Sequence, residues 1–138
     1  MTNQDNPDDY GEFDAVMSAF DNQVHWFEHG YHATFRFWKT PTQQEGKHPY
    51  RYELVLHDPG GVRIMGYDNA HPIKWKSGVF TKHSENPDHF HRTKSDAGRP
   101  YEFVSLTKLL DDFYTRVEQT LRELGIPADI TATTNMKG

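Results

Sequence analysis

The amino-acid sequence predicts an α+β fold: an antiparallel meander sheet of three to five strands, covered by a long C-terminal amphipathic helix, with a short helix near the N-terminus. Apolar and polar residues alternate in three segments, residues 32–38, 50–57 and 62–67, which is typical of strands. The connection Asp58-Pro59-Gly60-Gly61 is a strong turn signal, because proline fixes its own φ and glycine accepts a positive one. Strands joined by such hairpin connections pair in antiparallel fashion.

Both helices are predicted from apolar residues at helical spacing. The short helix is expected over Phe13–Phe20, where the apolar positions are Phe13, Val16, Met17 and Phe20. The C-terminal helix has Ser105 as its N-cap, Gly125 at the position of a left-handed C-terminal cap, and Pro127 to block its continuation. One apolar stripe runs along it: Leu106, Leu109, Leu110, Phe113, Val117, Leu121 and Leu124. We expect this stripe to pack on the sheet.

Length and composition indicate one small domain. The 138 residues divide into a mobile acidic N-terminus (residues 1–12), a single α+β domain (13–126) and a loose C-terminal tail (127–138). Cysteine does not occur in the sequence, which excludes disulfides and thiolate zinc sites. Neither a signal peptide nor a membrane-spanning apolar run is recognisable, so a cytoplasmic location without a membrane partner is expected.

The formal net charge of −5 argues against broad non-specific binding of nucleic acid, which requires a positive surface. The charges are unevenly distributed, because acidic residues concentrate at 5–14 and 102–123, whereas residues 36–99 hold more basic than acidic side chains. A small RNA-binding site is therefore compatible with the charge of the chain.

Chemically active side chains concentrate between Met65 and Phe103, where four of the nine histidines lie: His71, His83, His89 and His91. Residues 72–98 are predicted to form a long loop with room for one short strand, and loops of this length in small domains are usually functional or disordered. His89 and His91 are two residues apart, so on an extended segment they point to the same side. Such a pair can act as general acid and general base, with Asp88 orienting an imidazole, or can hold a metal ion. The alternative is two solvent-exposed loop histidines.

Further candidate site residues flank this pair. Tyr67, Asp68 and Asn69 end the third predicted strand; their alternative roles are core packing for the tyrosine and turn hydrogen bonding for the other two. Four arginines could bind phosphate groups through bidentate hydrogen bonds, and the alternative for each is a solvated surface charge: Arg51, Arg63, Arg92 and Arg99. The sequence contains no phosphate-binding loop, dinucleotide fingerprint, serine-hydrolase elbow or zinc-protease motif.

Several short motifs follow one another in a specific order. They are Tyr50-Arg51-Tyr52-Glu53-Leu54, Gly66-Tyr67-Asp68-Asn69, Asp88-His89-Phe90-His91, Pro100-Tyr101-Glu102-Phe103-Val104-Ser105-Leu106 and Leu109-Leu110-Asp111-Asp112-Phe113. Over residues 33–124 this set resembles the TumE family, the toxin components of prokaryotic toxin–antitoxin systems. The resemblance implies a helix-turn-helix antitoxin as partner, and Tyr67, Asp68, Asn69, His89 and His91 as site residues. Two features depart from compact members: the insert between Asn69 and Asp88, and the acidic N-terminal extension.

The sequence thus favours a toxin-like endoribonuclease that uses the His-x-His segment on an RNA substrate. One of the two histidines would abstract the ribose 2′-OH proton, the other would protonate the leaving oxygen, and an arginine would stabilise the charge on phosphorus. The expected catalytic set is His89, His91, Asp68, Tyr67, Asn69 and Arg92, and the expected substrate-binding set is Arg51, Arg63 and Arg99.

Two alternatives to metal-free cleavage are retained. No cofactor is expected, but in a metal-assisted phosphodiester hydrolase Asp68, His89 and His91 would be the ligands of a divalent ion. In the other alternative the chain is a non-catalytic interaction protein. It would bind a helix-turn-helix antitoxin or another partner through an aromatic sheet face made by Phe35, Phe37, Trp38 and Tyr52. A homodimer is compatible with each of these readings.

Overall fold

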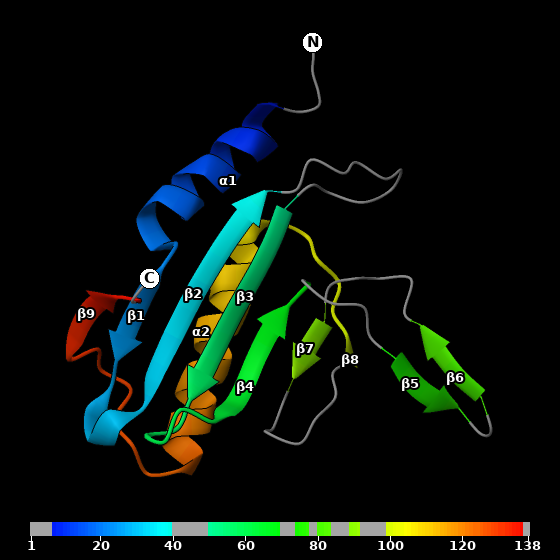
Figure 1. Ribbon diagram of the computed structural model, residues 1–138. Helices are drawn as coiled ribbons and strands as arrows, with labels where there is room; N and C mark the ends of the chain where they lie inside the picture. The colour runs from blue at the N-terminus through cyan, green and yellow to red at the C-terminus, as the bar shows by residue number, and fades with distance from the viewer. Residues whose placement is uncertain are drawn as a thin grey trace.

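Two helices cover one face of an antiparallel sheet (Figure 1). The structure is a computed structural model that describes residues 7–39, 50–69, 74–77, 80–83, 89–91 and 99–136. In chain order its elements are α1 (Pro7–Phe20), β1 (Gln23–Trp26), a 3-10 turn (Glu28–Gly30), β2 (His32–Lys39), β3 (Tyr50–His57), β4 (Arg63–Asp68), β5 (Lys74–Ser77), β6 (Phe80–His83), β7 (His89–His91), β8 (Arg99–Pro100), α2 (Leu106–Glu123) and β9 (Ala132–Asn135). This arrangement confirms the predicted α+β architecture.

The three predicted strands form the centre of the sheet. β2, β3 and β4 pair antiparallel in sequence order, with Phe35 opposite Leu54 and Leu54 opposite Tyr67. The predicted turn between β3 and β4 is also present. Asp58 Oδ1 accepts hydrogen bonds from the backbone N–H groups of Gly60 and Val62, both at 2.9 Å. Gly61, with φ of 88°, occupies the left-handed region that the turn requires.

The sheet is wider than the sequence predicts. Within the described residues it has seven strands, in the order β8-β7-β4-β3-β2-β1-β9. The four additional strands are only two to four residues long, and alternation cannot be recognised over so short a span. β5 and β6 form a two-stranded sheet of their own, so the insert contributes a separate hairpin.

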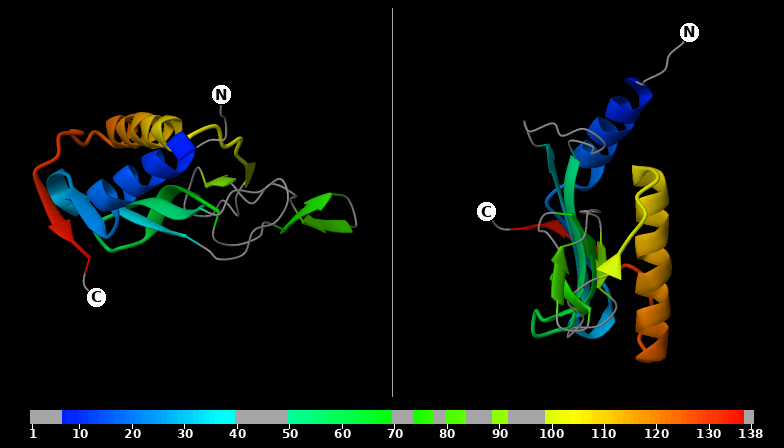
Figure 2. Two further views of the ribbon diagram at one scale, coloured as in Figure 1. Left: turned by 90° about the horizontal axis from the view of Figure 1, so that it is seen from above. Right: turned by 90° about the vertical axis from the view of Figure 1, so that its right-hand side faces the viewer.

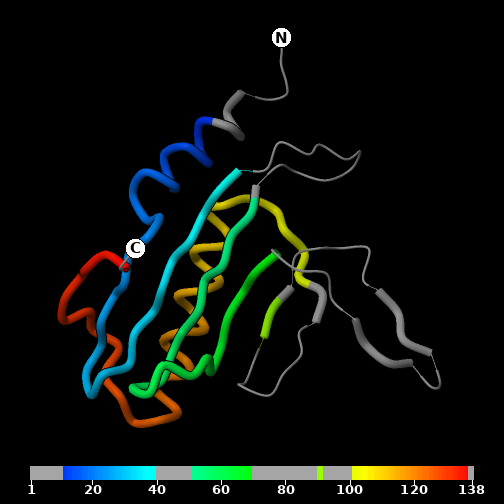
Figure 3. Tube along the Cα trace, in the orientation of Figure 1, coloured from blue at the N-terminus to red at the C-terminus, as the bar shows by residue number. Residues whose placement is uncertain are grey.

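Regular structure extends further toward both ends than predicted. α1 begins at Pro7 rather than at Phe13, so the boundary expected at residue 12 falls inside a helix. The prediction of a loose tail over residues 127–138 is corrected for β9, which pairs antiparallel with β1. Trp26 Nε1 donates a hydrogen bond of 2.9 Å to Thr134 Oγ1 across this pair. Figure 3 shows the trace returning from α2 to this edge of the sheet.

Both helices lie on the same side of the sheet (Figure 2). We call this side the helix face and the other side the opposite face. The core lies between the helices and the sheet, and its fully buried side chains include Phe13, Phe35, Phe37, Tyr52, Leu54, Leu56, Met65, Leu106, Leu109, Phe113, Val117 and Leu121. The predicted stripe of α2 is therefore confirmed, with two exceptions at its margins: Leu110 is half-buried and Leu124, the C-cap residue, is 50% exposed.

The ends of α2 follow the predicted capping pattern. Ser105 Oγ accepts the backbone N–H of Lys108 at 3.1 Å. At the other end Gly125 has φ of 75°, its N–H donates to Arg122 O, and the N–H of Ile126 donates to Leu121 O at 2.8 Å. These are the two bonds of a Schellman motif. The length of α2 is thereby fixed, and with it the position of the helix side chains over β4 and β7.

Candidate functional site

The predicted site residues lie on two neighbouring strands, β4 and β7. The antiparallel register places Gly66 opposite His91, Tyr67 opposite Phe90 and Asp68 opposite His89. Side chains alternate between the two faces of a sheet. Tyr67 and Phe90 consequently face the helices, whereas Asp68 and His91 lie on the opposite face. The sheet itself therefore separates Tyr67 from the aspartate and histidine with which it was grouped in the sequence.

Asp68 and His91 form the contact that gives this site its chemistry. His91 Nε2 lies 3.0 Å from Asp68 Oδ2, and the two side chains are only 7% and 14% exposed. A carboxylate bound to one imidazole nitrogen fixes the orientation of the ring. The aspartate that orients His91 is Asp68, from the neighbouring strand. The sequence analysis proposed Asp88 for this role, but Asp88 lies outside the described residues, as do His71 and Arg92.

The second histidine of the segment, His89, is described only through its backbone, which places it directly opposite Asp68. That His89 and His91 act together as acid and base stays a prediction. The alternative from the sequence was a metal site formed by Asp68, His89 and His91. Among the side chains that the structure describes, no group of three histidine, aspartate or glutamate residues is arranged to hold a metal ion.

Arg63 lies close to the Asp68–His91 pair because Gly66 has no side chain. A Cβ atom added to Gly66 would lie 3.6 Å from Arg63 Cδ and 3.0 Å from the carbonyl oxygen of Leu54. The aliphatic part of Arg63 therefore packs next to Gly66, the residue that the register places opposite His91. Of the other predicted phosphate-binding arginines, Arg51 is half-buried on β3, and Arg99 is described only as part of the short strand β8.

Two charged residues near the site were not predicted. Glu53 on β3 lies directly opposite Asp68, and Arg36 on β2 lies directly opposite Glu53. Two carboxylates at adjacent cross-strand positions repel each other. Here Arg36 Nη1 lies 3.6 Å from Glu53 Oε1, and His91 contacts Asp68, so that each carboxylate has a basic neighbour. The strand alternation in the sequence could have placed Glu53 on this face, but only the register places it beside Asp68.

Asn69, by contrast, has a structural contact at the end of β4. Its side chain is buried, and its Oδ1 accepts the backbone N–H of Tyr52 at 2.9 Å. The backbone N–H of Asn69 donates to Tyr52 O at 3.3 Å. Asn69 therefore continues the pairing of β3 with β4 by one residue, through bonds to the neighbouring strand rather than to its own local backbone.

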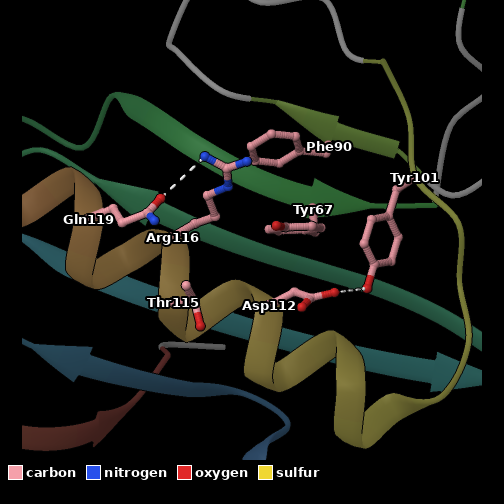
Figure 4. Close-up of a pocket in the computed structure, with 7 residues that line it drawn as sticks. All are labelled: Tyr67, Phe90, Tyr101, Asp112, Thr115, Arg116 and Gln119. Carbon is pink, nitrogen blue, oxygen red and sulfur yellow. Dashed lines mark hydrogen bonds between the residues drawn. The ribbon is translucent and has the colours of Figure 1, made fainter.

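The helix face carries a pocket of about 390 Å³ between α2 and the β4–β7 edge (Figure 4). We call it the Arg116 pocket. Its lining residues are Tyr67, Phe90, Tyr101, Asp112, Thr115, Arg116 and Gln119. The Arg116 guanidinium lies over the Phe90 ring, 5.0 Å from its centroid. Burial raises the pKa of Tyr67, and the nearby Arg116 partly offsets this rise. This pocket was not predicted from the sequence, because its walls come from β4, β7, α2 and the segment between β8 and α2 that holds Tyr101.

The aromatic surface proposed for partner binding is not a surface. Phe35, Phe37 and Tyr52 are 0%, 2% and 0% exposed, because all three point to the helix face and are covered there. Trp38 alone points to the opposite face, where the Arg36 guanidinium lies 5.4 Å from its ring centroid. This correction follows from strand alternation: Trp38 lies one residue after Phe37 and three residues after Phe35, and odd separations place side chains on opposite faces of a strand.

Comparison with known protein families gives a match that includes β4 and β7, the two strands of the candidate site. The sequence profile of the family described as "Toxin TumE" matches residues 27–121. The chain belongs to the TumE toxin family. Comparisons with curated proteins and with solved structures gave no match. The matched residues run from Phe27 to Leu121, so they span β2 to β8 and nearly all of α2.

Membership of the TumE family makes this a toxin-like protein and implies an antitoxin partner in general terms. Asp68, His91, Gly66 and the Arg116 pocket all lie inside the matched residues, whereas α1, β1 and β9 lie outside them. Among the described residues, no helix is both long enough and apolar enough to cross a membrane.

Proposed function

We propose that this TumE-family toxin is an endoribonuclease whose reaction centre is the Asp68–His91 pair on the opposite face of the sheet. The observation that carries the proposal is the 3.0 Å contact between His91 Nε2 and Asp68 Oδ2, with the stem of Arg63 packed next to Gly66. An oriented imidazole, a carboxylate and a guanidinium are the groups that metal-free cleavage of a phosphodiester needs.

The reaction would use the ribose 2′-hydroxyl as its nucleophile. One histidine of the His89/His91 pair takes the 2′-OH proton, and O2′ attacks phosphorus. The bond from phosphorus to the 5′-oxygen of the next nucleotide breaks, and the other histidine protonates that leaving oxygen. The products are a 2′,3′-cyclic phosphate and a free 5′-hydroxyl. Asp68 holds His91 by Nε2, which leaves the proton exchange with substrate to Nδ1. Arg63 stabilises the negative charge on the phosphorane.

The distribution of charge is compatible with an RNA substrate despite the net charge of −5. α1 has four acidic residues and no basic one, and they are Asp8, Asp9, Glu12 and Asp14. These acids belong to the helix layer. On the opposite face, the charged side chains of the central strands are Arg36, Arg51, Arg63, Glu53 and Asp68, an excess of one positive charge before any histidine is protonated. RNA phosphates would therefore meet the less acidic side of the protein.

The antitoxin partner is proposed to be a helix-turn-helix protein that suppresses this activity. The proposal rests on the family to which the chain belongs. Expression of the toxin alone should slow growth of the host cell, and co-expression of the neighbouring helix-turn-helix gene should relieve the effect. Normal growth with abundant folded toxin would contradict this part of the proposal.

The reaction itself is tested by cleavage of a labelled single-stranded RNA. Replacing His91 or His89 by alanine should slow cleavage about 10²- to 10⁴-fold, the usual share of a general acid or base. The matched control is His29→Asn. His29 is exposed in the 3-10 turn, and its φ of 63° is one that asparagine tolerates. This control should cleave at the wild-type rate.

Each protein is assayed with and without EDTA. Full activity in EDTA supports the metal-free reaction, whereas loss of activity that divalent ions restore would favour Asp68, His89 and His91 as metal ligands. Unchanged cleavage by both histidine variants would remove the His-x-His segment from the mechanism. Absence of cleavage by folded wild-type protein on a varied RNA pool would refute the endoribonuclease proposal.

A further inference from the structure

The Arg116 pocket lies across the sheet from the Asp68–His91 pair and plays no part in the proposed reaction. Its polar side chains come from one face of α2, where Asp112, Thr115, Arg116 and Gln119 follow one another at helical spacing. Its apolar wall comes from the sheet edge. The Tyr67 ring lies 4.7 Å from Phe90 and 5.0 Å from Tyr101, measured between centroids. The pocket is therefore aromatic on one side and polar on the other.

Arg116 has the only positive charge among the lining residues, and no carboxylate of the described residues lies within 4.0 Å of it. Its contacts include the Phe90 ring, a hydrogen bond of 3.3 Å from Nη1 to Gln119 Oε1, and a side-chain hydrogen bond to the Tyr67 hydroxyl, whose oxygen accepts it. The guanidinium has five N–H donors and these contacts use few of them. Stacking on an aromatic ring also holds its plane in one orientation, which prepares it for a ligand.

The one acidic group of the pocket, Asp112, is already neutralised. Lys108 Nζ lies 3.0 Å from both oxygens of Asp112, and the Tyr101 hydroxyl donates to Asp112 Oδ2 at 2.6 Å. Repulsion of an anion by Asp112 is therefore small, and the charge that a ligand meets in the pocket is that of Arg116.

Tyr67 adds a second donor next to the guanidinium. The residue is only 4% exposed, and Figure 4 shows its hydroxyl pointing toward α2, below Arg116. The hydroxyl oxygen accepts a hydrogen bond from Arg116. A hydroxyl group can accept and donate at once, so its own proton can be donated to a ligand that Arg116 also contacts.

We propose that the Arg116 pocket binds the phosphate group of a nucleotide. Arg116 donates two N–H groups and Tyr67 donates its hydroxyl to the phosphate oxygens, while the rings of Tyr67 and Tyr101 supply the surface for the sugar or base. A guanidinium fork matches phosphate geometry, and a pocket of about 390 Å³ is in the size range of small-ligand sites. The proposal is independent of the Asp68–His91 reaction, since the sheet separates the two sites.

Calorimetric titration of the full chain tests the proposal. The probes are inorganic phosphate, adenosine 5′-monophosphate, uridine 5′-monophosphate, and a short 2′-O-methyl RNA with or without a 5′-phosphate, which cannot be cleaved through its blocked 2′ positions. Acetate and an acidic peptide are the carboxylate probes. Nucleotides should bind more tightly than inorganic phosphate, because only they reach the aromatic wall. Preference for the mononucleotides or for the 5′-phosphorylated RNA identifies the source of the phosphate.

Two substitutions and two matched controls assign the binding to this pocket. Arg116→Gln should weaken nucleotide binding about tenfold or more, equivalent to about 1.4 kcal/mol. Arg122→Gln removes an exposed arginine one turn and a half further along α2 and should have no effect. Tyr67→Phe keeps the ring and should weaken binding several-fold, whereas Tyr114→Phe removes a hydroxyl that contacts His25 instead and should not.

Three results would overturn the proposal. They are absence of binding of every phosphate probe at millimolar concentration, equal affinities of Arg116→Gln and Arg122→Gln, and binding of the carboxylate probes as tightly as the nucleotides. The last result would assign the pocket to an acidic segment of a partner protein. If Arg116→Gln does not fold, Arg116→Lys replaces it, because lysine keeps the charge but loses the planar fork and should bind phosphate more weakly.

Discussion

Replacement of Phe113 by alanine should destabilise the protein more than most other single changes. The Phe113 ring is 0% exposed and lies at the middle of α2, where it joins the helix to two strands. It makes edge-to-face contacts with Phe35 of β2 at 5.5 Å and with Tyr67 of β4 at 6.2 Å, measured between centroids. Truncating a buried phenylalanine to alanine typically costs about 3–5 kcal/mol, a large part of the roughly 5–15 kcal/mol that stabilises a domain.

Equilibrium unfolding in urea, followed by tryptophan fluorescence, measures the effect. With a urea dependence of roughly 1–3 kcal/mol per molar, the midpoint should fall by about 1 M or more. The control is Val104→Ala, because Val104 precedes the same helix but is 61% exposed, and surface substitutions usually change stability by less than about 0.5 kcal/mol. A Phe113→Ala midpoint within the range of the Val104→Ala midpoint would refute the packing of α2 on the sheet.

Two further predictions concern Gly66 and His25. Gly66→Ala places a Cβ 3.0 Å from Leu54 O and 3.6 Å from Arg63 Cδ. The free energy of unfolding should fall by about 1–3 kcal/mol, and RNA cleavage should slow because Arg63 is displaced. Wild-type stability together with wild-type cleavage would contradict the site geometry. Burial lowers the pKa of His25 below its usual 6.5, so below that pH the unfolded chain takes up a proton that the folded chain resists. The free energy of unfolding should therefore fall as the pH drops from 7 toward 5, and this fall should be shallower in His25→Gln; identical pH profiles for the two proteins would remove His25 as a cause.

The elements with long periodic patterns could be predicted from the sequence alone. β2, β3 and β4 alternate over six to eight residues, and α2 has both caps and a stripe of buried apolar side chains. β9 could not be found in this way. Its sequence, Ala132-Thr133-Thr134-Asn135, is exposed at every position. Its place in the sheet depends on backbone pairing with β1 and on the Trp26–Thr134 hydrogen bond, which have no counterpart in local hydrophobicity.

The candidate site was predictable in composition but not in arrangement. The sequence identifies Asp68 and His91 as candidate residues, but their contact depends on the register between β4 and β7, which are separated by the long insert. The sequence could have separated Tyr67 from Asp68, because adjacent residues on a strand point to opposite faces. The side chain of His89 lies outside the described residues, so its predicted role keeps its sequence basis only.

The central claim is that Asp68 and His91 act as one unit in RNA cleavage. A double-mutant cycle with Asp68→Asn, His91→Ala and the combined variant, assayed on one labelled single-stranded RNA, tests it most directly. If the aspartate acts through the histidine that it contacts at 3.0 Å, the double variant should cleave no more slowly than His91→Ala alone, as residues that act together are strongly non-additive. Rate losses that multiply in the double variant would show that the two residues act independently, and would contradict the account.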